Sequence, residues 1–219
     1  MCGQNSIATK RPKMNREPDR IPIYHITHLD NLPGILSDGG LHSDKIMAQR
    51  NPTAIGYTHI KQRRLSEIRV GCCGGRFVGE FVPFYFCPRS PMLYTINRGN
   101  TGHAPGCQRT ILHLVSTLAA GIGQNRAWAI SDGNAGASHV SFSADLAVLA
   151  ELDWAAIHAR QWQGRIHQKS AEFLLADFFA WTNLQRIGCH SDQIALQVIN
   201  LLKNQTNLPD VSVEPNWYY

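Results

Sequence analysis

Two histidines and a threonine lie in residues 22–36, PIYHITHLDNLPGIL, where a short apolar strand is expected to lead directly into a helix. The end of a strand and the start of a helix expose backbone N–H groups beside the ring nitrogens of His25, with Thr27 close by. Such a set of groups suits a ligand that carries amides and phosphates. A core histidine that hydrogen-bonds to the backbone is the alternative, and the segment by itself does not exclude it.

A carboxylate and an aromatic block supply two further groups that could do chemistry. Glu172 opens the apolar segment 171–175, which is expected to form a strand. Residues 81–94, FVPFYFCPRSPMLY, combine stacking rings with a guanidinium, which is typical of a platform for an unpaired base or for nicotinamide. Hydrophobic core is the alternative, and we accept it for the central phenylalanines, whereas an arginine such as Arg89 is rarely buried without a partner.

Positive charge is concentrated early in the chain. The net charge is +5, the pI is about 9.0, and one short region holds several basic residues. These residues are Lys61, Arg63, Arg64, Arg69 and Arg76. Their field favours partners that bear phosphates, although a solvated basic surface would show the same composition.

The 219 residues suit one domain, and a hydrophobic content of 43% is enough for a core. No apolar run reaches the ~18 residues of a membrane-spanning helix. The polar, basic residues 1–20 lack the apolar stretch of a signal peptide, so we expect a mobile N-terminal arm and a cytoplasmic protein. The six cysteines show no framework spacing, which favours reduced thiols, and the lack of a C-x-x-C pair leaves zinc binding only a weak alternative.

Short strands and short helices alternate along the chain, which predicts an α+β or mixed α/β fold. We expect a strand and then a helix over 22–38, further strands at 80–87, 111–116, 127–131, 171–175 and 181–189, and a last strand in the tail after 210. Further helices are expected at 54–70, 90–98, 117–123, 146–157 and 192–203, with loops at 43–53 and 158–169. Pro83 indicates a sheet edge or a bulge. No G-x-G-x-x-G or P-loop motif occurs, so a standard nucleotide-binding fold is not expected.

Several motifs are similar to the DarT family, the toxin halves of DarTG toxin–antitoxin systems. In order along the chain they are YHITHLDNLPGIL, YTHIKQRR, VPFYFCPRSPMLY, ILHLV, SHVSF, KSAEFL and the terminal WYY. The similarity runs from Ile21 to Tyr219, and the block VPFYFCPRSPMLY is long and unusual in composition. The resemblance implies a single ADP-ribosyltransferase domain over residues 21–219, of α+β class, with a split, perpendicular β-core and flanking helices.

The resemblance also implies an activity. DarT proteins bind NAD as a co-substrate in the cleft of the split core and transfer its ADP-ribose onto a base of single-stranded DNA, and a DarG antitoxin removes the mark through its macrodomain. Family members mark thymidine or guanosine, and the aromatic block here is more similar to the thymidine-modifying branch. We therefore expect a cytoplasmic toxin that modifies thymidine in single-stranded DNA in a sequence-specific manner, without a metal and without a membrane.

Glu172 aligns with the family's catalytic glutamate, and Arg64 aligns with an arginine held near the reaction centre. Cleavage of the glycosidic bond of NAD passes through an oxocarbenium-like sugar, which a nearby carboxylate stabilises. The carboxylate can also take the proton from the attacking base nitrogen. The guanidinium can hold the pyrophosphate or polarise a base carbonyl, and the adjacent Arg63 is the rival for this role.

Further site residues follow from the same resemblance. The residues expected to contact NAD are His25, Thr27, Asn31, Gly34, Leu41, Arg64 and Tyr85. The residues expected to contact DNA are Tyr57, Arg89, Met92, Tyr94, His139 and Arg165. In this fold the segment before the glutamate strand, residues 143–169, contacts the acceptor, and we expect its aromatic and basic side chains, among them Trp162 and Lys169, to be exposed and to favour a single strand.

Three rival functions stay open. A transferase of the same fold could act on guanosine, on RNA or on protein. A catalytically silent module could bind nucleic acid through charge alone, which predicts strong salt dependence without NAD consumption. A metal-dependent nuclease is disfavoured, because no cluster of Asp, Glu and His has ligand spacing.

Overall fold

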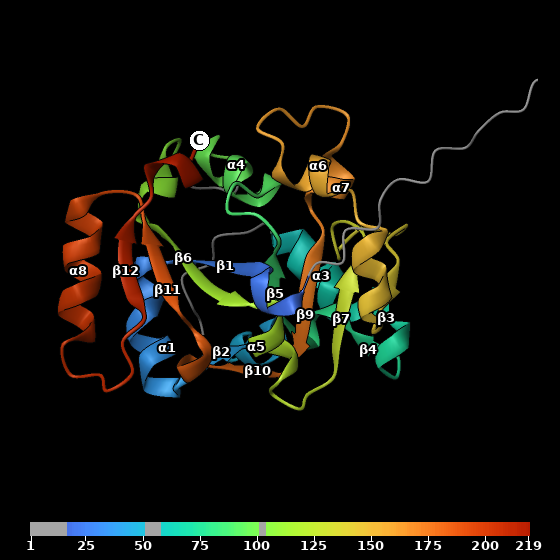
Figure 1. Cartoon of the computed structure of the whole chain (residues 1–219), viewed down its shortest axis with the longest axis horizontal. Helices are drawn as coiled ribbons and strands as arrows, with labels where there is room; N and C mark the ends of the chain where they lie inside the picture. Colours follow the sequence, from blue (N-terminus) through green and yellow to red (C-terminus); the bar gives the residue numbers. More distant parts are fainter. Residues whose placement is uncertain (1–16, 51–57, 101–103) are drawn as a thin grey trace, which may run out of the picture.

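The computed structural model describes residues 17–50, 58–100 and 104–219. In this part of the chain eight strands form one sheet in the order β12-β11-β6-β1-β5-β9-β7-β8 (Figure 1). The strands are β1 (Pro22–His28), β5 (Phe81–Tyr85), β6 (Ile111–Thr117), β7 (Trp128–Ser131), β8 (Phe142–Ser143), β9 (Glu172–Ala176), β11 (Arg186–Cys189) and β12 (Asp210–Val213). Two small antiparallel sheets accompany it, β10 (Phe178–Ala180) with β2 (Gly40–His42) and β3 (Arg69–Val70) with β4 (Arg76–Phe77).

Short helices flank the large sheet. In the described residues they are α1 (Leu32–Asp38), α2 (Asp44–Met47), α3 (Thr58–Ser66), α4 (Pro91–Asn97), α5 (Leu118–Ile122), α6 (Trp154–His158), α7 (Ile166–Lys169) and α8 (Asp192–Leu202). Turns of 3-10 helix lie at Pro18–Arg20, Leu29–Asn31, Gly71–Cys73, Val78–Glu80, Cys107–Thr110, Leu146–Ala150, Trp181–Asn183 and Pro215–Trp217. A mainly antiparallel sheet with separate helices confirms the predicted α+β class.

A seam between β1 and β5 divides the large sheet into two halves. Strand β1 pairs with β6 along its whole length, and β5 pairs with β9 along its whole length. Between β1 and β5, pairing in the described residues is confined to one position, Tyr24 with Tyr85. The two strands therefore part beyond this pair, and Figure 1 shows β1 crossing steeply to β9 and β7. The seam corresponds to the split of the β-core that the family resemblance implies.

Pro83 lies in the centre of the sheet, so the predicted sheet edge or bulge is wrong. Its carbonyl accepts a hydrogen bond from the His25 ring of β1 at 2.9 Å. The N–H and C=O of one strand residue point to the same side, so the N–H that proline lacks would face the seam. Because β1 has parted from β5 there, the missing donor costs no bond of the ladder.

Local signals fix the two helices nearest the seam. Helix α1 ends at Gly39, whose φ of 71° suits glycine and whose N–H binds the carbonyls of Ile35 and Leu36. Helix α4 begins after Ser90, whose hydroxyl oxygen accepts a hydrogen bond from the Leu93 N–H at 3.2 Å. Both helices lie where the sequence predicts them.

Two expected helices are shorter or divided. The helix expected over 54–70 ends at Ser66, and the helix expected over 146–157 is divided into a 3-10 turn and α6. Asp153 causes the second break, because its carboxylate accepts a hydrogen bond from the Ala156 N–H at 3.0 Å and starts a new helix.

Short elements also replace expected loops. The segments 43–53 and 158–169 contain α2 and α7, and the strand expected over 181–189 begins with a 3-10 turn. Strands β2 and β10 have three residues each, too few to show the alternation that identifies a strand. Of the expected N-terminal arm, residues 1–16 lie outside the described part, so the arm and the single domain stay predictions.

Aromatic packing holds the two strands beside the seam in place. Phe84 on β5 lies 6.2 Å from Phe173 on β9 and 4.7 Å from Phe179 on β10, measured between ring centroids, and all three side chains are buried. A close-packed core resists small displacements, so β5 and β9 form a rigid support for their polar residues. None of the helices in the described ranges is long and apolar enough to cross a membrane.

Candidate active site

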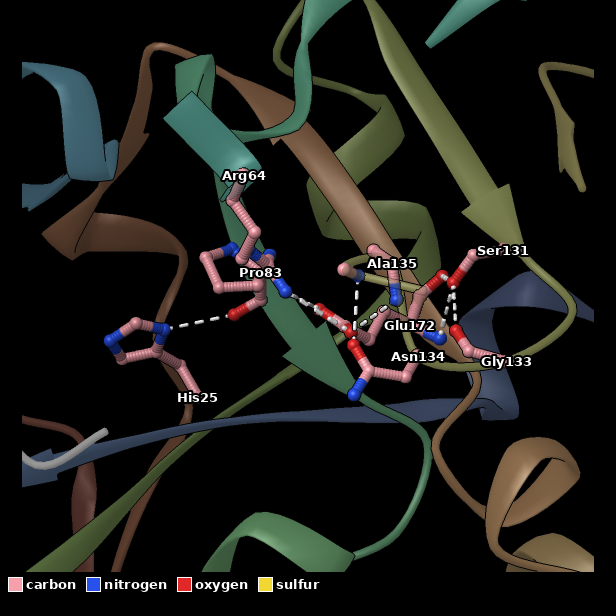
Figure 2. A network of polar contacts seen from close by, with 9 residues as sticks. His25, Arg64, Pro83, Ser131, Gly133, Asn134, Ala135 and Glu172 are labelled. Atoms are coloured by element: carbon pink, nitrogen blue, oxygen red, sulfur yellow. Dashed lines mark hydrogen bonds and ion pairs between the residues drawn. The ribbon is translucent and has the colours of Figure 1, made fainter. Parts of the chain in front are cut away.

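Glu172 lies at the first position of β9, with 1% of its surface exposed. Its Oε1 accepts a hydrogen bond from the Ala135 N–H at 2.9 Å, and its two oxygens lie 3.3 and 3.1 Å from Arg64 Nη1, which donates to them (Figure 2). Its neighbour across the strand pair is Tyr85, which is the seam residue of β5. A carboxylate is buried in this way only where hydrogen bonds and an opposite charge replace water, so the fold maintains a fixed carboxylate beside the seam.

The loop after β7 holds Glu172 from another side. The Glu172 N–H donates to Ser131 Oγ at 3.0 Å, and the Ser131 hydroxyl donates to the Gly133 carbonyl at 2.7 Å (Figure 2). This turn presents the Ala135 N–H to the carboxylate. Sequence reasoning missed Ser131 and Ala135, and the glycine-rich run directly after a predicted strand is the signal that could have indicated them.

Arg64 lies on α3 with 8% of its surface exposed. Burial lowers the pKa of its guanidinium, but Glu172, Asp44 and Tyr85 together outweigh this effect, so the pKa is raised and the group stays charged. Its Nε and Nη2 are buried and have no hydrogen-bond partner in the described part of the protein. Buried donors normally have partners, so these two are suited to the acceptor atoms of a ligand. The rival Arg63 pairs instead with Glu67 at 3.1 Å on the surface, so the structure brings Arg64 to Glu172.

His25 and Thr27 lie on β1, across β5 from Glu172. The His25 Nδ1 lies 2.9 Å from the Pro83 carbonyl, so Nδ1 carries the proton and Nε2 is an acceptor (Figure 2). Burial lowers the pKa of His25 despite this hydrogen bond, which keeps the ring neutral at pH 7. The Thr27 hydroxyl is buried and accepts a hydrogen bond from Asn31 Nδ2 at 3.2 Å. The backbone hydrogen bond of His25 uses Nδ1 alone, so the alternative of a core histidine bonded to the backbone accounts for one of its two ring nitrogens.

The other residues expected to contact NAD lie on both sides of the seam. Gly34 is exposed on α1, and Tyr85 is half-buried on β5. Burial and, to a smaller extent, the charge of Glu172 raise the pKa of Tyr85. Leu41 is 3% exposed, and its side chain packs in the main core. Its backbone, rather than its side chain, is therefore the part that could contact a ligand.

An aromatic cluster forms where α4, the C-terminus and the segment before β9 meet. The Arg89 guanidinium lies 4.3 Å from the centroid of the Tyr219 ring. Tyr94, which is 37% exposed, meets Tyr219 and Trp162 edge to face, with centroids 5.1 and 5.5 Å apart. Met92 is half-buried on the same helix. Rings beside a guanidinium can stack on bases, so the cluster joins three predicted DNA contacts to Tyr219, which the site prediction missed.

Two of the remaining DNA-contacting candidates have exposed side chains. His139 is exposed, and its ring centroid lies 4.7 Å from that of His167, which in turn lies 3.3 Å from Asp132. Arg165 is exposed just before α7. Tyr57 lies outside the described residues.

Lys169 is not exposed, which corrects the expectation for the segment before β9. Only 2% of its surface is accessible, because its ammonium donates to backbone carbonyls inside the protein. Trp154 of the same segment is half-buried and packs against Phe86, with ring centroids 5.5 Å apart. Within the described ranges, no group of three or more His, Cys, Asp or Glu is placed to hold a metal ion.

Comparisons with known proteins agree with this architecture. The family model described as ssDNA thymidine ADP-ribosyltransferase, DarT, matches residues 24–219. A DNA ADP-ribosyl transferase of Thermus sp. (strain 2.9) is 40% identical over 209 residues, which are 92% of this chain and 98% of the relative. Solved structures of Thermus sp. 2.9 DarT in complex with ADP-ribosylated ssDNA and with NAD+ match with TM-scores of 0.84 and 0.81, at 38% and 36% identity. They cover 92% and 93% of this chain, and 98% and 100% of theirs.

A shorter match links the chain to a two-part protein. A DNA ADP-ribosyl transferase-DNA ADP-ribosyl glycohydrolase fusion protein of Thermosipho africanus is 37% identical over 75 residues, which are 34% of this chain and 19% of the relative. The full-length similarities confirm the predicted ADP-ribosyltransferase fold. The family model matches residues 24–219, a range that includes Arg64, Glu172 and the paired residues of the seam. The chain therefore belongs to the DarT family.

Proposed function

We propose that this protein transfers ADP-ribose from NAD onto thymidine bases of single-stranded DNA in a sequence-specific manner. The observation that carries the proposal is the buried carboxylate of Glu172, fixed by Arg64 and by the Ala135 N–H beside the seam of the sheet. Family membership supports the two substrate classes, since the similar Thermus protein was solved with NAD+ and with ADP-ribosylated ssDNA.

Glu172 acts on the ribose of NAD that bears nicotinamide. The bond between ribose C1 and nicotinamide breaks, the electron pair leaves with nicotinamide, and the sugar becomes an oxocarbenium ion. A carboxylate that is already fixed stabilises this positive charge without reorienting. A nitrogen of the base then bonds to C1, and its proton passes to Glu172.

Arg64 performs two tasks through different nitrogen atoms. Nη1 donates to both oxygens of Glu172 and so sets the orientation of the carboxylate. Nε and Nη2, buried without a partner in the described part, donate to the pyrophosphate of NAD or to a carbonyl of the base. Each task needs a guanidinium, because an ammonium cannot offer donors in a planar array.

The NAD side of the site consists of β1 and the residues that follow it. His25 Nε2, the Thr27 hydroxyl and the Asn31 amide hold the ribose hydroxyls and the nicotinamide amide, with Gly34 allowing close approach of the dinucleotide. A neutral imidazole is suited to this task, because it adds no positive charge beside the cationic nicotinamide ring. Tyr85 closes the site between His25 and Glu172.

The DNA side consists of the aromatic cluster and the segment before β9. Tyr94 stacks on an unpaired base, Arg89 and Arg165 contact phosphates, and Met92 and His139 complete the surface. Rings and flexible cations favour a single strand over a duplex, in which base faces are hidden.

Incubation with NAD and a panel of acceptors tests the proposal. A thymidine-containing oligonucleotide should gain the mass of one ADP-ribose, and the same oligonucleotide with cytidine at every thymidine position should gain none. A gain on guanosine, on RNA or on protein would favour the corresponding rival. Salt-sensitive DNA binding without NAD consumption would favour a silent binding module. A folded protein that modifies no acceptor would refute the transferase.

The biological setting is a further part of the proposal. We place the protein in the cytoplasm as a toxin whose partner is a DarG-type antitoxin with a macrodomain. The fusion of a transferase to a glycohydrolase in the Thermosipho relative supports a paired enzyme that removes the mark. Expression should stop growth of a bacterial host, and co-expression of a DNA ADP-ribosyl glycohydrolase should restore it, whereas normal growth without the glycohydrolase would contradict the toxin role.

A further inference from the structure

Lys169 lies three residues before Glu172 and is 2% exposed. Its Nζ donates to the carbonyls of Ile157 and Ala159, at 2.9 and 2.8 Å, and lies 3.7 Å from Cys87 Sγ. Lysine is almost never fully buried unless it is paired, and the partners here are two carbonyls and a thiol rather than a carboxylate. Burial lowers the pKa of Lys169, so the protein maintains an unfavourable group at this position.

The two carbonyls lie at the end of α6. The last carbonyls of a helix have no partner within it, and a donor from elsewhere can satisfy them. Lys169 is also the last residue of α7, so its side chain connects the C-terminal ends of the two helices. The Lys169 ammonium therefore bridges the base of the segment between them, residues 159–165.

This closed segment carries side chains that suit an unpaired nucleic acid strand. Arg160 and Arg165 are exposed, and Ile166, which follows the segment, is 57% exposed. Trp162 contacts Tyr94 of the aromatic cluster, with ring centroids 5.5 Å apart. Figure 1 shows the segment as the orange loop between α6 and α7, next to α4. Cations for phosphates and a ring for a base are the groups from which single-strand sites are built.

We infer that Lys169 is a positioning residue that holds segment 159–165 at the acceptor side of the site and so controls the binding of DNA rather than of NAD. The inference rests on the proposed function, because it assigns a task within that site. Lys169 itself is too deeply buried to touch DNA. Without its ammonium, the buried carbonyl of Ile157 and the partly buried carbonyl of Ala159 would lose a donor, and the base of the segment would open. The hydrogen bonds that hold His25 and Glu172 in place do not involve Lys169.

Lys169→Met removes the ammonium but keeps an unbranched apolar chain, and Lys203→Met at an exposed lysine after α8 is the matched control. We expect K169M to raise the KM for a thymidine oligonucleotide about 10-fold or more, since small misplacements of binding groups have effects of this order. The Kd for NAD, from calorimetric titration, should stay within about 2-fold because its contacts are independent. Trypsin should cleave after Arg160 and Arg165 faster in K169M than in K203M or wild type.

Wild-type values for both the DNA KM and the tryptic cleavage rate would overturn the inference, as would equal losses of NAD and DNA binding. Lys169→Gln, which keeps one N–H donor, serves in the same assays if K169M does not fold, and the same outcomes decide. The cleavage measurement needs no catalysis, so it still tests the anchoring of the segment if the wild-type protein transfers nothing. A wild-type protein that transfers no ADP-ribose would refute the proposed function but not the anchoring of the segment.

Discussion

Replacement of Arg64 by methionine would leave the Glu172 carboxylate inside the protein without its opposite charge. The carboxylate is 1% exposed, and among the described residues the backbone N–H of Ala135 would be the donor left to its oxygens. Removing one partner of a buried ion pair typically destabilises a protein by about 3–5 kcal/mol, because the remaining charge is uncompensated. In a domain of this size each kcal/mol lowers Tm by about 2–4 °C, so R64M should unfold about 6–20 °C below wild type.

Thermal unfolding followed by circular dichroism measures this loss, and Arg63→Met is the matched control. Arg63 pairs with Glu67 on the surface, where their side chains are 39% and 56% exposed. Such pairs on a helix contribute about 0.5 kcal/mol or less, so R63M should shift Tm by about 2 °C at most. The double variant R64M/E172Q should recover most of the loss, because it removes the unpaired charge as well.

Two results would refute this reasoning. An R64M protein as stable as R63M would show that the buried carboxylate does not depend on Arg64. A double variant no more stable than R64M would attribute the loss to packing of the arginine chain rather than to charge.

Two further predictions concern DNA binding and acid stability. Tyr94→Ala removes the exposed ring of the aromatic cluster and should raise the KM for a thymidine oligonucleotide about 5- to 150-fold, the equivalent of about 1–3 kcal/mol of base stacking, with the Kd for NAD unchanged. An unchanged KM would exclude stacking on Tyr94. His113 is 0% exposed, and burial lowers its pKa to about 4, so as the pH falls the unfolded chain takes up this proton before the native protein does. Stability is therefore full above about pH 6.5 and should fall by about 3 kcal/mol by pH 4 through this residue. Urea unfolding at pH 7 and pH 4.5 should show the loss in wild type and a clearly smaller loss in His113→Gln, and equal losses in both would contradict the assignment.

Local sequence signals account for much of the fold around the site. The strand and helix over 22–38 were predictable because apolar residues indicate both elements and Gly39 marks the end of the helix. Glu172 was identifiable because one acidic residue opens an otherwise apolar strand and lies in a motif similar to the DarT family. In both places the side chains to which we assign the chemistry have a type and a position that are visible in the sequence.

The parts that were not predictable depend on backbone groups or on contacts between distant segments. The Ala135 N–H holds Glu172, and the carbonyls of Ile157 and Ala159 explain the burial of Lys169. Every residue has such backbone groups, so the sequence does not reveal which of them bind a side chain. From the sequence, Pro83 resembles an edge residue. A proline is tolerated in the centre of this sheet because β1 parts from β5, and this parting is a property of the tertiary structure.

Neighbouring residues of the same type are also difficult to distinguish from the sequence. Arg63 and Arg64 are adjacent, so composition and charge treat them alike, and only the direction of α3 relative to β9 separates them. The structure brings Arg64 into the protein and leaves Arg63 on the surface.

The most direct measurement compares the rates at which wild type and Glu172→Gln transfer ADP-ribose to a thymidine oligonucleotide, with the Kd for NAD measured in parallel. The amide keeps the size of the side chain but removes the charge and the proton acceptor. We expect the rate to fall about 10²- to 10⁴-fold or more, with NAD binding within about 2-fold of wild type. An E172Q protein that transfers ADP-ribose at the wild-type rate would show that the buried carboxylate is not the group that acts on NAD.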